Sequence, residues 1–274
     1  MSFIQGSARR ISGLLGRESW LVHNLRPAYE SFLDWSGNGR GIPWEINGET
    51  YRVDPHHRQR LGQNYDASVA EFLRERVVRG ALCIDVGANV GVYVLQFARW
   101  SGPTGRIVAF EPNPSARTVL HRHIQMNGLT EQVTVVPNAV GASIGEAILY
   151  AADADGMSRL GAPNKEIADR VSPLTVPVVT LDAYCETDRL KPDWLLIDIE
   201  GVEICALAGA KRLIQSRRGQ MGIIVEMHPN VWGSADTTRD TAETLLAELG
   251  LEPVPLTGQA DPLGEHGLVH LGYC

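Results

Sequence analysis

The sequence predicts an α/β fold with a doubly wound, mostly parallel sheet. Short apolar runs alternate with segments of helical periodicity from about residue 66 onward, the order expected of strands joined by crossover helices. Glycine, asparagine and proline stand at the junctions, where helix ends and tight turns favour them. Two strand-like segments, 252–256 and 268–272, indicate a C-terminal antiparallel hairpin that completes the sheet.

Each predicted strand is an apolar run bounded by turn residues. The strands are expected at 81–86, 107–110, 133–136, 194–199 and 221–227. The helices are expected at 66–79, 91–100, 114–127, 204–216 and 238–249. Asn113 and Pro114 suit the start of the third helix, because an asparagine side chain caps amides and proline needs no amide hydrogen there. Residues 141–180 are less regular.

Length and composition bound the class of protein. A chain of 274 residues accommodates one large α/β domain with a small appendage, and 44% hydrophobic with 21% charged residues is ordinary for a globular protein. The net charge of −7, without a basic stripe beyond the N-terminal forty residues, argues against a nucleic-acid partner. No apolar run is long enough to span a bilayer, so the cytoplasm is the expected location. The cysteines lack zinc-site spacing and are expected to be reduced: Cys83, Cys185, Cys205 and Cys274.

The N-terminal part, 1–60, is predicted to be a small extension of the main domain, 61–274. Residues 8–35 place apolar side chains at helical spacing among arginines, which indicates an amphipathic helix. Packing on the chain's own core or on a second subunit is favoured over contact with a membrane surface, so the extension is a candidate lid or homo-oligomer contact. Residues 44–53 alternate around an Asn-Gly pair, a strong hairpin signal.

The most informative segment runs from Cys83 to Gly91, where an apolar strand enters a glycine-bearing turn that opens a helix. Gly87 permits a tight turn and close approach of a ligand, and Gly91 lets the helix lie near the sheet. Glu111 ends the next strand 24 positions after Gly87, and a carboxylate there can accept both hydroxyl hydrogens of a ribose. This pair leaves two ligands open, NAD and S-adenosylmethionine.

The residues of the turn discriminate between these ligands. Dinucleotide sites place glycine at the middle position so that a pyrophosphate can meet bare backbone, whereas here that position is Asn89. Asp85 would repel phosphate but can hold the ammonium of a methionine moiety, directly or through water. The sequence therefore favours S-adenosylmethionine over NAD.

Six segments in the same order resemble the FkbM-type methyltransferases over about residues 60–230: IDVGANVGVYVLQFA, GRIVAFEPNPSARTVLHRHIQMNG, VVPNAVG, VPVVTLDAY, WLLIDIEGVEICALAGA and IIVEMH. This resemblance implies a class I methyltransferase (Rossmann-like) fold, S-adenosylmethionine as methyl donor, and O-methylation of a hydroxyl on a small molecule, sugar or natural product. One position departs from the family pattern, since Leu196 stands where these proteins often have a lysine.

The resemblance also implies a set of cofactor-binding residues. The turn after the first strand would hold the methionine part, Glu111 the ribose, and the segment after the third strand the adenine. The implied residues are Asp85, Gly87, Ala88, Asn89, Gly91, Glu111, Pro112, Asn138, Ala139 and Asp198.

Ionisable residues follow the fourth and fifth strands of the predicted main sheet. Asp198 and Glu200 come at the end of one, and Glu226 and His228 at the end of the other. Because ligands of open α/β sheets bind beyond the carboxyl ends of the strands, these four side chains are expected to meet at the methyl acceptor. Asp198, Glu226 and His228 are the candidate catalytic residues, with His228 or Asp198 as the base.

Other roles remain open for the same residues. Asp198, Glu200, Glu226 and His228 can instead hold Mg²⁺ or Mn²⁺, which would lower the pKa of the acceptor hydroxyl. Glu200 or Glu203 can simply cap the next helix, and His228 can be a loop histidine. At the level of the whole protein, an NAD-binding oxidoreductase or epimerase and a catalytically inert interaction domain remain as alternatives to a methyltransferase acting on a small-molecule or carbohydrate acceptor.

Overall fold

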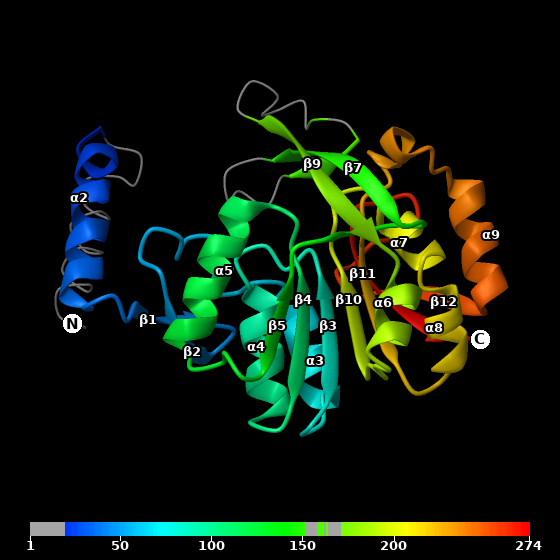
Figure 1. The fold of residues 1–274 in the computed structure, drawn as a ribbon, viewed down its shortest axis with the longest axis horizontal. Coiled ribbons are helices and arrows are strands. Elements are labelled where there is room, and N and C mark those ends of the chain that lie inside the picture. Colours follow the sequence, from blue (N-terminus) through cyan, green and yellow to red (C-terminus); the bar gives the residue numbers. More distant parts are fainter. Residues whose placement is uncertain (1–19, 152–157, 162, 164–170) are drawn as a thin grey trace.

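The computed structural model describes residues 20–151, 158–161, 163 and 171–274 (Figure 1). Its centre is a seven-stranded sheet with strand order β12-β13-β11-β10-β3-β4-β5. In that order the strands are Leu251–Pro255, Gly267–Tyr273, Gly222–Met227, Trp194–Ile197, Leu82–Val86, Arg106–Phe110 and Val133–Val136. In this sheet β13 runs antiparallel to both neighbours, β11 and β12, and the other pairs are parallel. The predicted α/β fold with its C-terminal antiparallel hairpin is confirmed.

Helices cover both faces of this sheet. One face carries α3 (Ala67–Arg76), α4 (Val92–Ser101) and α5 (Pro114–Met126), and the other carries α6 (Leu181–Thr187), α7 (Glu203–Ala208), α8 (Lys211–Ser216) and α9 (Arg239–Leu249). Alternate residues of β3 enter the two cores, so that Cys83 packs on the first face and Ile84 on the second. Among the described helices, none is long and apolar enough to cross a membrane.

Most helices and strands begin and end close to the predicted turn and capping residues. The side chain of Asn113 accepts a hydrogen bond of 2.9 Å from the amide of Ser115 and caps α5 as predicted. The helix predicted at 204–216 is instead divided into α7 and α8. Gly209 lies at the break, where a β-carbon would be 2.1 Å from the carbonyl oxygen of Gly141, so this close approach of the two segments requires glycine.

A second sheet of four strands, in the order β6-β9-β7-β8, was not predicted. Its strands are Ala139–Val140, Ser172–Val179, Gly145–Ala151 and Arg159–Leu160. They fall in the segment that the sequence presents as irregular, because β9 is mostly exposed and contains two prolines, which hides the alternation of a half-buried strand. This sheet lies beside one end of the main sheet (Figure 1), and its residues form part of the lining of the cavity described below.

The N-terminal hairpin is confirmed. Strands β1 (Ile42–Ile46) and β2 (Glu49–Val53) are joined by Asn47 and Gly48, both with positive φ. The hairpin shares an apolar core with α4 and α5, and Asn47 donates a 2.9 Å hydrogen bond to Gln96 of α4. Of the predicted amphipathic helix, 8–19 lies outside the described residues, and the remainder belongs to α2 (Trp20–Ser36). The division at residue 60 and a role as lid or oligomer contact remain predictions.

Candidate functional site

A cavity of about 360 Å³ opens at the carboxyl ends of the central strands. It is bounded by the ends of β3, β4, β10 and β11 and by residues of the second sheet. Eleven of the predicted site residues line it: Asp85, Gly87, Ala88, Asn89, Glu111, Pro112, Asn138, Ala139, Asp198, Glu200 and Glu226. Gly91 and His228, which were also predicted, lie outside the lining.

The turn after β3 is held by main-chain contacts to the neighbouring strands. Gly87 and Ala88 each donate a 3.0 Å hydrogen bond to the carbonyl oxygen of Phe110 in β4. Gly87 has φ +92°, and a β-carbon there would be 1.8 Å from the carbonyl oxygen of Asp198. This glycine therefore brings two strand ends together besides lining the cavity. Gly91, with φ +95°, packs its α-carbon against Leu120 of α5 and so sets how closely α4 and α5 approach.

Two buried carboxyls lie on adjacent strands at the base of this cavity. Asp85 is 2% exposed, and its Oδ2 atom has no hydrogen-bond partner in the part of the chain that the structure describes. Glu111 accepts hydrogen bonds of 2.7 Å from the amides of Asn89 and Asn113, one on each oxygen. Burial, and then the nearby Glu111, raises the pKa of Asp85 to about 7, and burial raises the pKa of Glu111 to about 7.

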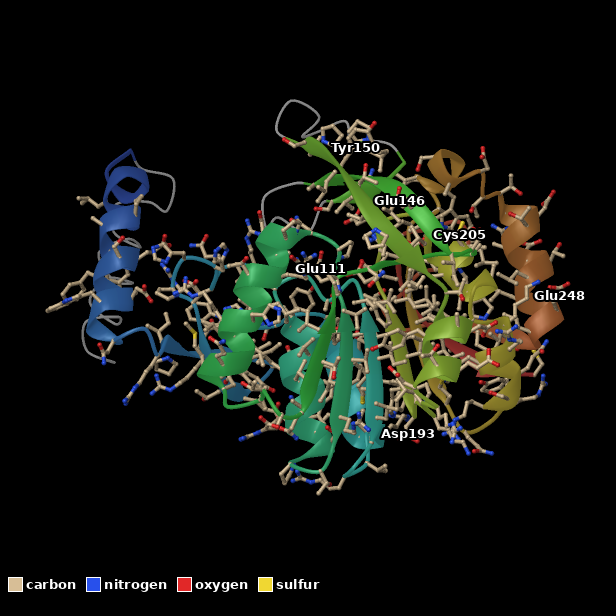
Figure 2. The ribbon with its side chains drawn as sticks, viewed as in Figure 1. Glu111, Glu146, Tyr150, Asp193, Cys205 and Glu248 are labelled. Carbon is tan, nitrogen blue, oxygen red and sulfur yellow. The ribbon has the colours of Figure 1, made fainter. Side chains whose placement is uncertain are left out.

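Figure 2 shows Glu111 between the main sheet and the second sheet. The side chain of Asn113 donates a 3.0 Å hydrogen bond to the hydroxyl of Ser158, just before β8, and ties the two sheets together near the cavity. Pro112 is also in this wall, as predicted.

Aromatic side chains that the sequence did not single out form another wall. Tyr65 and Tyr93 pack edge to face with ring centroids 5.7 Å apart, and both line the cavity. The hydroxyl of Tyr93 donates a 3.0 Å hydrogen bond to Asp66. Burial, followed by the charge of Asp66, raises the pKa of Tyr93. Tyr93 comes two residues after Gly91, so its place in the first turn of α4 was a signal that it could face the ligand.

The predicted reaction centre is only partly assembled as expected. Asp198 lies just beyond β10, and burial, followed by the charge of the nearby Glu226, raises the pKa of Asp198 well above its usual range. Glu200 has φ +54° and turns toward β8, where its Oε2 atom lies 2.9 Å from a guanidinium nitrogen of Arg159. Of the four predicted metal ligands, Glu226 and His228 belong to a group of three possible ligands whose atoms lie within 4.8 Å of one another; Asp198 and Glu200 are not in that group.

Glu203 and His228 form a buried pair behind the cavity. The Oε1 atom of Glu203 accepts hydrogen bonds from the amide of Gly201 at 2.7 Å and from Nδ1 of His228 at 2.6 Å, and its Oε2 atom accepts one from Trp232 at 3.0 Å. Glu203 is fully buried and His228 is 6% exposed. Glu203 is thus more than a helix cap, and His228, although it lies in the loop after β11, is buried and paired with Glu203.

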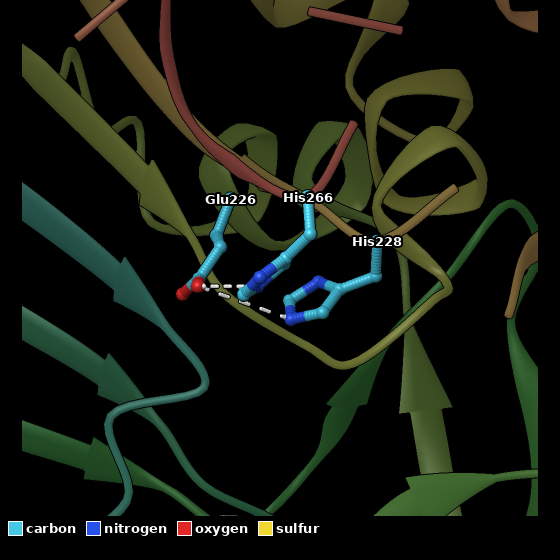
Figure 3. A group of neighbouring side chains, drawn as sticks. All are labelled: Glu226, His228 and His266. Carbon is cyan, nitrogen blue, oxygen red and sulfur yellow. Dashed lines mark hydrogen bonds and ion pairs between the residues drawn. The ribbon is translucent and has the colours of Figure 1, made fainter. Parts of the chain in front are cut away.

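His266, which was not predicted, completes a group with Glu226 and His228 (Figure 3). Its Nε2 atom lies 2.8 Å from Oε1 of Glu226. The antiparallel register pairs Met227 with Gly267, and this places the residues that flank the pair, His228 and His266, side by side. Sequence spacing cannot reveal a strand register of this kind.

The family model of the methyltransferase FkbM domain matches residues 85–251, more than half of the chain. The chain belongs to the FkbM methyltransferase family. This match confirms the resemblance seen in the sequence, and the matched residues contain both buried carboxyls and the Asp198–Glu226 pair of the cavity. No curated protein matches the sequence of this FkbM methyltransferase.

Several solved structures are similar to this FkbM methyltransferase at low identity. An FkbM methyltransferase from Methylobacillus flagellatus KT is 16% identical, with a TM-score of 0.44; the match covers 70% of this chain and 43% of that one. An O-methyltransferase from Bacillus cereus, in complex with SAH, is 16% identical, with a TM-score of 0.45 and coverage of 75% and 80%. A putative O-methyltransferase from Klebsiella pneumoniae is 15% identical, with a TM-score of 0.46 and coverage of 76% and 79%. Likenesses at this level do not determine what this chain binds.

Proposed function

We propose that this FkbM methyltransferase transfers a methyl group from S-adenosylmethionine to a hydroxyl oxygen of a small molecule or carbohydrate. The observation that carries the proposal is the unpaired Oδ2 atom of Asp85 at the wall of the cavity, which has no partner among the described residues. A buried carboxylate oxygen without a partner is costly, and the ammonium of the donor's methionine part would satisfy it.

The remaining parts of the donor also have suitable neighbours. Each oxygen of Glu111 accepts one amide hydrogen and keeps a lone pair, so the carboxylate can accept the two hydroxyl hydrogens of a ribose. Asn138 and Ala139, which follow β5, line the cavity where the adenine would lie. A volume of about 360 Å³ is within the range of small-molecule sites.

The acceptor would be deprotonated by Asp198. When bound, S-adenosylmethionine supplies an electrophilic methyl group on sulfur, which an aligned oxygen displaces. In its ionised form Asp198, which lines the same cavity, would take the hydroxyl proton as the oxygen–carbon bond forms and the sulfur–carbon bond breaks. His228 is a less suitable base, because it lies outside the cavity lining and its Nδ1 atom is bonded to Glu203.

A screen of acceptors with isotope-labelled S-adenosylmethionine tests the class of acceptor. We expect label to enter compounds that carry free hydroxyls and to be lost when the reactive hydroxyl is blocked. Transfer to amines or carboxylates alone would contradict O-methylation of a hydroxyl.

Removal of the Glu111 carboxylate is expected to weaken donor binding. The Glu111→Ala variant loses the predicted ribose contact, and hydrogen bonds to charged groups contribute about 1.5–3 kcal/mol, equivalent to roughly 10- to 100-fold in affinity. Calorimetric titration with S-adenosylhomocysteine measures the change. Glu131→Ala removes an exposed glutamate outside the cavity lining and serves as the matched control. Unchanged affinity in Glu111→Ala, or tighter binding of NAD than of S-adenosylhomocysteine by the wild type, would refute the assignment.

Donor affinity is also expected to depend on pH. Asp85 and Glu111 have pKa values near 7 in the free protein, and an ammonium is attracted only by the ionised form of Asp85. Affinity for S-adenosylhomocysteine should therefore fall as the pH drops below about 7, by up to about tenfold per pH unit for each proton that must be released. Asp85→Asn should bind more weakly and with a flatter profile. A wild-type affinity that stays constant between about pH 5.5 and 8 would contradict this.

A further inference from the structure

Three donor atoms converge at the edge of the cavity (Figure 3). Oε1 of Glu226 lies 2.8 Å from Nε2 of His266 and 4.0 Å from Nε2 of His228, and one ligand atom from each residue lies within 4.8 Å of the others. Among the described residues, no other group of three or more histidines, cysteines, aspartates or glutamates is arranged this closely. The three side chains come from β11, from the loop after it and from the residue just before β13.

The orientation of His228 is fixed by its other ring nitrogen. Nδ1 bonds to the buried carboxylate of Glu203 at 2.6 Å, and Trp232 holds the second oxygen of Glu203. A carboxylate on one nitrogen keeps the proton there and leaves the opposite nitrogen with a lone pair, which is the usual support of a metal-binding histidine. In that form Nε2 of His228, which lies 4.0 Å from Oε1 of Glu226, has a lone pair available for a cation that Glu226 also binds.

We propose that Glu226, His228 and His266 bind a divalent transition-metal ion. Two imidazoles and one carboxylate suit Zn²⁺, Co²⁺, Mn²⁺ or Fe²⁺, whereas Mg²⁺ prefers a set made of oxygen atoms. Metal–ligand distances of about 2.0–2.2 Å require ligand atoms about 3–3.5 Å apart. The observed separations reach this spacing through small side-chain rotations, for which His266, at 56% side-chain exposure, has room.

The bound ion would face the methyl acceptor. Glu226 and Asp198 both line the cavity, and three protein ligands leave a coordination position for an oxygen of a bound molecule. This role rests on the proposed function: a hydroxyl in the open position would become more acidic and release its proton to Asp198 more readily. Metal binding itself does not depend on the identity of the donor or acceptor.

Titration of the untagged, chelator-treated full chain with Co²⁺ alone tests the site. We expect one ion per chain, detected by calorimetry and by the visible absorption of Co²⁺ bound to nitrogen and oxygen ligands. His266→Ala should weaken binding more than about 100-fold, since it removes a ligand, and Glu203→Gln should weaken it about 10- to 100-fold through His228. His121→Ala removes an exposed histidine of α5 and is the matched control, expected to bind as the wild type does.

Because His266 is largely exposed, its replacement leaves the core intact, and thermal unfolding can confirm this. Failure of the wild type to bind Co²⁺ or Zn²⁺ would overturn the proposal, and so would equal affinities in the wild type and His266→Ala. The titration contains no methyl donor. A negative result would therefore leave the S-adenosylhomocysteine measurements unaffected, and loss of donor binding would leave the cobalt spectrum unaffected.

Discussion

Asp198→Asn is expected to lower kcat for methyl transfer about 10²- to 10⁴-fold, the usual contribution of a positioned general base. The amide keeps the shape of the side chain but cannot accept the acceptor's proton. Donor affinity should remain close to that of the wild type, because the proposed ammonium and ribose contacts belong to Asp85 and Glu111. The measurement is steady-state kinetics with an acceptor identified in the labelled-donor screen, together with titration of S-adenosylhomocysteine.

Loss of activity through unfolding can be separated from loss of the base. Asn at this position removes the repulsion between the two carboxyls of the Asp198–Glu226 pair, so the thermal midpoint should be equal to or above that of the wild type. Asp188→Asn, at an exposed position after α6, makes the same chemical change away from the cavity and should leave kcat unchanged. A kcat for Asp198→Asn within about threefold of the wild type would exclude Asp198 as the base.

Gly87→Ala is expected to lower the free energy of unfolding by about 2–5 kcal/mol. The new β-carbon would lie 1.8 Å from the carbonyl oxygen of Asp198, which is backbone and cannot move aside like a flexible side chain. Overpacking and a side chain at φ +92° each cost about 1–3 kcal/mol. Because the clash displaces the end of β10 from β3, binding of S-adenosylhomocysteine should be lost as well. Denaturant titration and calorimetry measure the two effects.

Gly48→Ala separates the contact from the backbone strain. Gly48, in the turn between β1 and β2, has φ +79°, and a β-carbon at this position would meet no atom within 4 Å, so only the strain remains. We expect a loss of about 1 kcal/mol and unchanged donor binding. Equal losses of stability in the two variants would show that the contact between Gly87 and Asp198 has little weight.

The donor side of the site could be predicted because its information is local. Asp85 and Gly87 belong to one strand and the turn that follows it, and Glu111 ends the next strand along the chain. In a parallel sheet the carboxyl ends of adjacent strands meet at one edge, so these positions follow from the order of elements. Whether the predicted residues hold S-adenosylmethionine remains for the titrations to decide.

The acceptor side could not be predicted to the same degree, because it depends on pairings between distant segments. His266 reaches Glu226 only through the register of β13 on β11, and Glu200 pairs with Arg159 of a sheet that the sequence does not reveal. Tyr65 enters the cavity from a segment before the first strand of the main sheet. A one-residue shift in any of these pairings would change which side chains meet, and periodicity alone does not choose between them.

The position of β13 between β11 and β12 orders the events of chain assembly. β12 is the edge strand, and its only hydrogen-bonding partner in this sheet is β13. It can therefore become part of the sheet only through the docking of β13 on β11. That docking closes a loop of about 45 residues, from Ile224 to His270, and carries the loop-closure entropy of a non-local contact. The same step brings His266 to His228. The three nitrogen and oxygen donors can therefore meet only once β13 has docked on β11.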